Sequence, residues 1–287
     1  MHAIPHPAAG TDRPAWIARH PLVAYFGLAY VISWAFEIPL AAAKQGWIQF
    51  PVPFAIHYLA SFGPMLAALI TAGMLEGRSG LRALFSGLLK WRVGLGWWLF
   101  SAFSPVVLFA LSVLAMRTMG GAWPNLSLLG QVDYLPYLGI VGAVLLWLLT
   151  YGLGEEIGWR GFALPRLQKQ HSALTASLIL SVFWAFWHTP AFLYRDVYMA
   201  MGLAAGLPML LISVAAAAII FTWIYNSTGG SLLMVVLFHA MFDFLLVSPA
   251  ANQTTSAILN AATMIWAVLV VIVFKPANLS RVEKQVS

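Results

Sequence analysis

Long apolar runs limit what this chain can fold into more than any other feature. A membrane-spanning α-helix needs about 20 mostly apolar residues, and eight runs meet or approach that length. The runs cover residues 22–42, 53–75, 97–116, 136 through the region of Glu155, 174–193, 207–225, 232–247 and 256–274. We therefore expect an all-α fold, a polytopic transmembrane helix bundle of about eight spans, over residues 21–275. Its motif-bearing core covers about 132–248, and tails occupy residues 1–20 and 276–287.

The composition excludes the main alternatives to a membrane protein. Only 8% of the residues are charged and 61% are apolar, whereas a soluble domain carries about 25% charged residues. Cysteine is absent, which excludes disulfides, Cys-ligated zinc and a thiol nucleophile. The net charge of +6 does not indicate a nucleic-acid partner, because the basic residues are scattered among apolar runs rather than gathered on one face.

The basic residues predict the orientation in the membrane. Twelve of the 15 Lys and Arg residues lie in the two tails and in the connections after the second and fourth spans. The other side carries only Lys44, Arg117 and Arg195. Cytoplasmic loops carry an excess of Lys and Arg, so we expect both termini in the cytoplasm of a cell with this chain in its plasma or inner membrane. The first twenty residues lack the apolar region of a signal peptide, and we expect the first span to stay uncleaved.

The connection at 76–95 has the pattern of an amphipathic helix. Apolar residues with helical spacing alternate there with the basic residues Arg82 and Lys90. This pattern is typical of a helix lying at the membrane surface. The apolar residues are Leu81, Leu84, Phe85, Leu88 and Leu89.

Charged residues at the end of the fourth run form the first unusual cluster. Glu156 and Arg160 are four residues apart, so they share a helical face and can pair. Glu155 points about 100° away from Glu156, and we expect it to lack a partner on its own helix. A charged cap at the membrane surface is the alternative interpretation, but the helix dipole disfavours acids at a helix C-terminus.

His188 follows an apolar, aromatic-rich run and is the second unusual residue. A histidine among aromatic residues is often merely structural. The fourth and fifth runs, however, predict an antiparallel hairpin whose turn lies between His171 and Ser172. Glu155 and His188 are equally far from that turn, at roughly 25 Å along the helices. We therefore expect the two side chains at the same depth.

His239 and Asp243 form the third cluster, four residues apart in the seventh run. A structural hydrogen bond between the two is the alternative to a functional role. Glu37 in the first run also lies at membrane depth and has no local partner, so it could line a cavity. His57 begins the second run, where a histidine at the membrane interface is the simpler interpretation.

Three protease motifs are absent or poorly supported. The zinc-binding His-Glu-x-x-His sequence does not occur. Gly-x-Ser-Gly at 77–80 resembles the rhomboid serine motif, but it lies in the basic loop, where a turn explains it. Gly-x-Gly-Glu at 152–155 resembles the aspartyl intramembrane protease motif with Asp243 as a second carboxylate. That interpretation leaves Arg160, His188 and His239 unexplained.

The three clusters together resemble the CAAX protease and bacteriocin-processing family of intramembrane endopeptidases (CPBP, or Abi). Their pattern is Glu-Glu-x-x-x-Arg, then aromatic-x-x-x-His, then His-x-x-x-Asn or Asp. The matching residues are Glu155, Glu156, Arg160, Trp184, His188, His239 and Asp243. The sequences 158–162 and 62–64 also look like this family, and the likeness covers most of the chain from the second span onward.

The resemblance implies a cytosol-facing cavity in which Glu155 activates water and His188 orients it. Glu156 and Arg160 would hold the geometry of the site, while His239 and Asp243 would stabilise the oxyanion. A carboxylate in such a cavity can act as a general base, and neutral His239 can donate to an oxyanion. Asp243 would donate only if protonated, and if ionised it would orient His239.

The leading functional hypothesis is therefore an endopeptidase that cuts a membrane-associated or lipidated peptide, with bilayer lipid around it. Aromatic residues would line the substrate cavity, namely Trp159, Phe162, Trp184 and Trp187. We expect no metal cofactor, although zinc held by Glu155, His188 and His239 is the natural rival. A proton-coupled transporter using the same residues and a non-catalytic immunity protein are the alternative functions.

Overall fold

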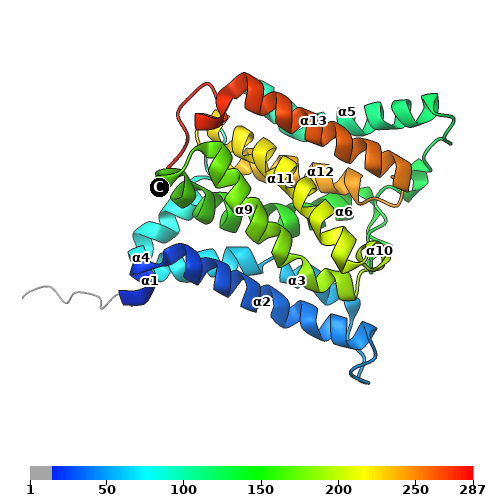
Figure 1. Ribbon diagram of the computed structural model, residues 1–287, viewed down its shortest axis with the longest axis horizontal. Coiled ribbons are helices and arrows are strands. Elements are labelled where there is room, and N and C mark those ends of the chain that lie inside the picture. The colour runs from blue at the N-terminus through cyan, green and yellow to red at the C-terminus, as the bar shows by residue number, and fades with distance from the viewer. Residues whose placement is uncertain (1–14, 287) are drawn as a thin grey trace, which may run out of the picture.

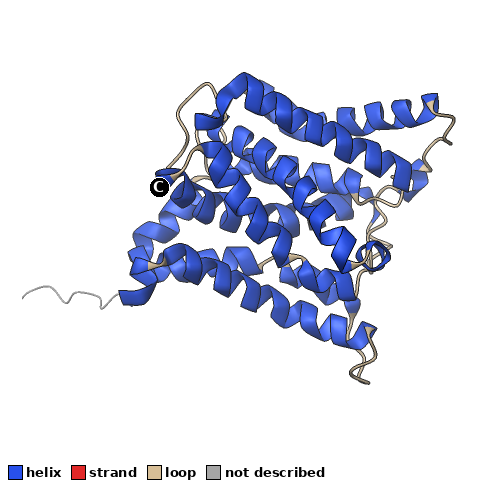
Figure 2. Cartoon of the chain, in the orientation of Figure 1, coloured by secondary structure: helices blue, strands red, loops and turns tan. Residues whose placement is uncertain are grey.

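A computed structural model describes residues 15–286, and this part of the chain contains helices and loops but no strand (Figure 2). The segments are α1 (Ala15–Arg19), α2 (Pro21–Lys44), η1 (Phe54–Ile56), α3 (His57–Ala60), α4 (Gly63–Ser86), α5 (Leu95–Thr118), η2 (Leu126–Leu128), α6 (Gly139–Trp147), η3 (Leu148–Glu155), α7 (Glu156–Gly158), η4 (Trp159–Ala163), α8 (Leu164–Gln170), α9 (Ala173–Trp187), η5 (Thr189–Leu193), α10 (Asp196–Met201), α11 (Leu203–Ser227), α12 (Leu232–Leu246) and α13 (Gln253–Asn278). Residues 1–14, which make up most of the expected N-terminal tail, lie outside the described part.

Seven helical segments of the described chain are long and apolar enough to cross a membrane. The eighth expected span corresponds to α12, which has only 15 residues. At 1.5 Å per residue, α12 is about 22 Å long, shorter than the roughly 30 Å hydrocarbon core of a bilayer. It packs between α5, α11 and η3, where the longer helices shield it from lipid. The expected polytopic helix bundle is thus confirmed.

The bundle has two distinct ends (Figure 1). The terminal end holds α1, the C-terminus and the hairpin turn at 171–172. The loop end holds the connections at 45–53, 119–138, 188–202 and 247–252. The hairpin turn is where the sequence predicts it, because α8 ends at Gln170 and α9 begins at Ala173.

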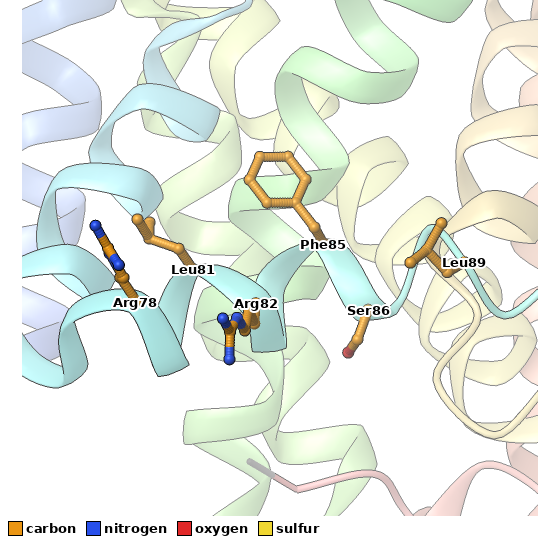
Figure 3. A pocket seen from close by; sticks show the side chains of 6 residues that line it. All are labelled: Arg78, Leu81, Arg82, Phe85, Ser86 and Leu89. Carbon is orange, nitrogen blue, oxygen red and sulfur yellow. The ribbon is translucent and has the colours of Figure 1, made fainter.

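The expected surface helix at 76–95 is the continuation of α4 beyond a kink. Gly77 adopts φ 58° and ψ −139° inside α4, a conformation that glycine adopts without steric cost. After the kink, Leu81 and Phe85 lie on one side of the helix and Arg82 on another (Figure 3). Ser79, from the rhomboid-like motif, donates to the carbonyl of Glu76 at 2.6 Å, as the turn interpretation predicts.

The helix that carries Glu155 continues well beyond this residue. The candidate span runs from Gly139 to Gln170 over 32 residues, so Glu155 lies near its middle rather than at its end, and that expectation was wrong. Two π-helical stretches, η3 and η4, interrupt the segment. Pro165 follows η4 and disfavours regular α-helical hydrogen bonding to the preceding turn. Thr150 in η3 donates to the carbonyl of Leu146 at 2.7 Å, which competes with the backbone ladder.

Two glycines let this segment approach α4 closely. A Cβ atom on Gly154 would lie 2.7 Å from the carbonyl oxygen of Ser61. A Cβ atom on Gly158 would lie 2.5 Å from the carbonyl oxygen of Pro64. Small residues four positions apart permit such backbone contact between membrane helices. This packing fixes the Glu155 segment against the start of α4.

Candidate active site

The Glu155 carboxylate is buried and is held at one oxygen by two indole groups. Trp184 donates its Nε1–H to Glu155 Oε2 at 2.8 Å, and Trp159 donates to the same oxygen at 3.2 Å. The other oxygen, Oε1, accepts no hydrogen bond from residues 15–286. The expectation that Glu155 lacks a partner on its own helix was wrong, because Trp159 lies four residues later on that helix. One carboxylate oxygen is nevertheless left for a water or substrate atom.

Trp184 contacts every predicted catalytic group except Asp243. Its carbonyl oxygen lies 2.8 Å from His188 Nδ1, and its ring centroid is 5.6 Å from that of His239. The Arg160 guanidinium lies 4.5 Å above the same ring. The sequence motif marks Trp184 as an aromatic position four residues before the histidine. Its hydrogen bond to Glu155 is the part of its role that the sequence did not indicate.

Glu156 and Arg160 form the expected ion pair. Arg160 Nη1 lies 2.9 Å from Glu156 Oε1, and both side chains are fully buried. Arg160 is also sandwiched between the rings of Trp184 and Phe221, at 4.5 and 4.7 Å. Arg160 therefore lies inside the bundle rather than in a cytoplasmic loop, and the excess of basic residues at the terminal end persists without it.

His239 lies between two carboxylates from different helices. Its Nδ1 is 2.8 Å from Glu156 Oε1, and its Nε2 is 3.4 Å from Asp243 Oδ2. The second distance is longer than an ordinary hydrogen bond. Asp243, at 22% side-chain exposure, forms the accessible edge of the site.

His188 has a defined tautomer when neutral. Its Nδ1 lies beside a carbonyl oxygen, which only accepts, so the proton must sit on Nδ1 and Nε2 keeps its lone pair. The ring stacks on Tyr198 of α10, with centroids 6.4 Å apart and an interplanar angle of 15°. Glu155 contacts Trp184, which lies four residues before His188 on α9. Equal depth of Glu155 and His188 stays a prediction.

The four aromatic residues expected around the substrate form two groups, one on α9 and one on η4, which meet where Trp159 packs edge-on against Trp187 at 6.1 Å. Trp184 contacts Glu155, and Trp187 packs edge-on against His188 at 4.8 Å. Trp159 and Phe162 are completely buried and pack against Tyr25 of α2. Only Trp159 of this second group contacts a catalytic residue. A substrate cavity lined by all four side chains stays a prediction.

The residues proposed for a zinc site do not form a ligand set. His239 faces carboxylates with both ring nitrogens, so it has no free lone pair aimed at Glu155 or His188. Among residues 15–286, no three His, Asp or Glu side chains are grouped as a metal ion requires. Metal independence of the reaction stays a prediction.

The accessible part of the site lies toward the loop end. His188 caps the end of α9, and Asp243 lies in the last turn of α12, both near the loops at that end of the bundle (Figure 1). The basic-residue count assigns the cytoplasm to the terminal end instead. The two expectations, cytoplasmic termini and a cytosol-facing cavity, thus point to opposite ends of the bundle.

Comparison with known proteins adds independent evidence for the family. Residues 137–245 match the family model described as type II CAAX prenyl endopeptidase Rce1-like. This segment is therefore similar to the Rce1-like family. All seven residues of the three motifs lie inside it, from Glu155 to Asp243.

A curated relative supports the assignment to the Rce1-like family. The chain is 27% identical over 170 residues to CAAX prenyl protease 2 of Methanococcus maripaludis. The alignment covers 56% of this chain and 60% of the relative. The predicted kinship with CAAX proteases is confirmed. Glu37 and His57 lie outside the residues that match the family model.

Proposed function

We propose that this chain is an intramembrane endopeptidase of the CAAX type. One observation carries the proposal: a buried glutamate, Glu155, is fixed at one oxygen by two indole N–H groups while its other oxygen is free. Glu155 lies in the segment that matches the Rce1-like family. A transporter would use such groups as a relay, but the sequence shows no internal repeat of the kind that favours that function.

Glu155 acts as the general base in the proposed reaction. Its Oε1 takes a proton from water while the water oxygen attacks the peptide carbonyl, and the protonated carboxyl then passes this proton to the leaving amine. The Nε2 lone pair of His188 accepts a hydrogen bond from the same water and so orients it. The Nε2–H of His239, which faces the Asp243 carboxylate at 3.4 Å, donates a hydrogen bond to the oxyanion as negative charge develops there. Glu156 and Arg160 hold His239 in place through the buried ion pair.

The proposed substrate is a lipidated or strongly apolar peptide at the membrane. The site is enclosed by aromatic side chains and lies at membrane depth, where an apolar segment is favoured over a hydrophilic one. Purified protein in detergent is expected to cleave a prenylated peptide faster than the same peptide without its lipid. Equal cleavage of both, measured by mass spectrometry, would contradict the substrate class but not the peptidase activity.

We propose that the reaction needs no metal ion. Glu155 can take the water proton directly, and His239 supplies a donor to the oxyanion. Activity should therefore survive exhaustive chelation, and metal analysis should find well below one equivalent of zinc. Activity lost on chelation and restored by added zinc would overturn this part of the proposal.

We further propose that both termini are cytoplasmic and that the protein resides in the plasma or inner membrane. The proposal rests on the excess of Lys and Arg at the terminal end. On this orientation, His188 and Asp243 lie in the half of the membrane away from the cytoplasm. Thiol labelling of single cysteines placed at the two ends of the bundle decides between this orientation and the reverse one.

A further inference from the structure

A second buried polar network lies beside the catalytic residues. His57 Nε2 is 2.8 Å from the Tyr151 hydroxyl, and His57 Nδ1 is 2.6 Å from the Tyr194 hydroxyl. The Tyr194 hydroxyl in turn donates to Glu37 Oε1 at 3.0 Å. All four side chains are less than 9% exposed. His57, which the sequence suggested as an interfacial histidine, is buried and bonded at both ring nitrogens.

The three hydrogen bonds of this network all run in one direction, with donors on the Tyr151 side and acceptors toward Glu37. Tyr194 lies just past the spanning segment, and burial, together with the neighbouring Glu37 carboxylate, raises the pKa of its hydroxyl. Tyr194 therefore keeps its proton and donates a hydrogen bond to Glu37. His57 Nδ1–H must then donate to the Tyr194 oxygen, and the neutral ring accepts the Tyr151 hydroxyl at Nε2. Each hydrogen bond of this network thus has a defined direction.

The network joins the two segments that carry the water-activating residues. Tyr151 lies in η3, four residues before Glu155, and Tyr194 caps η5, six residues after His188. His57 comes from α3, which belongs to neither segment. The His57 ring therefore connects η3 to the end of η5 through its hydrogen bonds with Tyr151 and Tyr194.

Other contacts anchor these helices without forming that bridge. Ser33 of α2 donates to the carbonyl of Ala60 at 2.7 Å, and Trp34 donates to the carbonyl of Trp187 at 3.0 Å. These bonds hold α2 on α3 and on α9, but they leave η3 unconnected to η5. These α2 contacts therefore serve as controls, because breaking one of them removes a hydrogen bond between helices without breaking the His57 bridge.

We propose that His57 is a positioning residue that holds Glu155 and His188 at their working separation through Tyr151 and Tyr194. The proposal rests on the peptidase function proposed above. Misplacing reacting groups by about 1 Å can lower a rate about a hundredfold. The effect should therefore appear in kcat, whereas KM should change little because both tyrosine hydroxyls are buried and bonded within the network.

The kinetic test compares Tyr151→Phe, His57→Phe and the double variant with Ser33→Ala. Tyr151→Phe keeps the ring that stacks on Trp147 at 4.5 Å and removes only the hydroxyl. Each single variant should lower kcat about ten- to a hundredfold with KM within about twofold. The double variant should be no worse than His57→Phe, because both break the same bridge. Ser33→Ala removes a buried hydrogen bond of the α2–α3 contact and should keep the wild-type kcat at temperatures where all variants are folded.

A distance measurement tests the bridge without relying on activity. The chain has no cysteine, so Leu149→Cys in η3 and Leu193→Cys in η5 give two unique spin-label sites, exposed by 54% and 38%. Pulsed EPR should give a broader or shifted distance distribution with His57→Phe and an unchanged one with Ser33→Ala. An unchanged distribution, a wild-type kcat in Tyr151→Phe, or losses that add in the double variant would overturn the proposal. If the wild-type protein cleaved no peptide, the proposed function would fail while this distance test still applied.

Discussion

The Trp184 indole donates to Glu155 Oε2 at 2.8 Å, and its backbone carbonyl lies 2.8 Å from His188 Nδ1. One residue thus orients the carboxylate and fixes the tautomer of the histidine. The hydrogen bond holds Oε2 and leaves Oε1 toward the reacting water. Trp184 is therefore a positioning residue for both partners of the proposed water activation.

Trp184→Phe should lower kcat about ten- to a hundredfold. The substitution removes a hydrogen bond to a charged group, which contributes about 1.5–3 kcal/mol, and each 1.36 kcal/mol of barrier corresponds to about tenfold in rate. Trp223→Phe is the matched control, because its buried Nε1 has no hydrogen-bond partner among the described residues. Initial-rate kinetics on a lipidated peptide measure both variants. Equal rates for the two would show that the indole N–H does not orient Glu155.

Arg160→Ala should destabilise the protein far more than Glu155→Gln does. Arg160 and Glu156 are both fully buried, and removing one partner of a buried pair costs about 3–5 kcal/mol because it leaves an uncompensated charge. Glu155→Gln keeps an oxygen that accepts from both indoles. Thermal unfolding in detergent measures the difference. Equal midpoints for the two variants would argue against an energetically important pair.

The excess of basic residues at the terminal end predicts which residues can be labelled from outside. Val286→Cys lies at the terminal end and Trp47→Cys at the loop end, with exposures of 55% and 66% in the parent side chains. A membrane-impermeant thiol reagent should label Trp47→Cys in intact cells and Val286→Cys only after permeabilisation. The reverse pattern would place the termini outside and the accessible edge of the site in the cytoplasm.

The sequence was sufficient to predict the helices that carry the candidate site. Apolar run length identified the seven candidate spans of the described residues and the shorter apolar helix α12, because hydrophobic length is a local property of the chain. The spacing of Glu156 and Arg160 correctly predicted their ion pair, since both residues lie on one helical face.

Contacts between distant segments were not predictable in the same way. The partner of Glu37 is Tyr194, 157 residues away, and no local pattern pairs them. The hydrogen bond between Trp184 and Glu155 joins residues 29 positions apart, and hydrophobic periodicity does not indicate it. The second carboxylate facing His239, from Glu156, also became apparent only from the packing of α12 on the Glu155 segment.

The most direct test of the account compares Glu155→Gln with wild-type protein on a lipidated peptide. Glu76→Gln serves as the control, because it changes an acid of a partly exposed ion pair with Arg166 at 2.7 Å, at a distance from the site. General-base catalysis contributes about a hundredfold to ten-thousandfold to a rate. We expect folded Glu155→Gln to lose at least about a hundredfold in kcat, and Glu76→Gln to keep the wild-type value. A folded Glu155→Gln variant with wild-type kcat would contradict the proposed role of Glu155 and, with it, the peptidase mechanism.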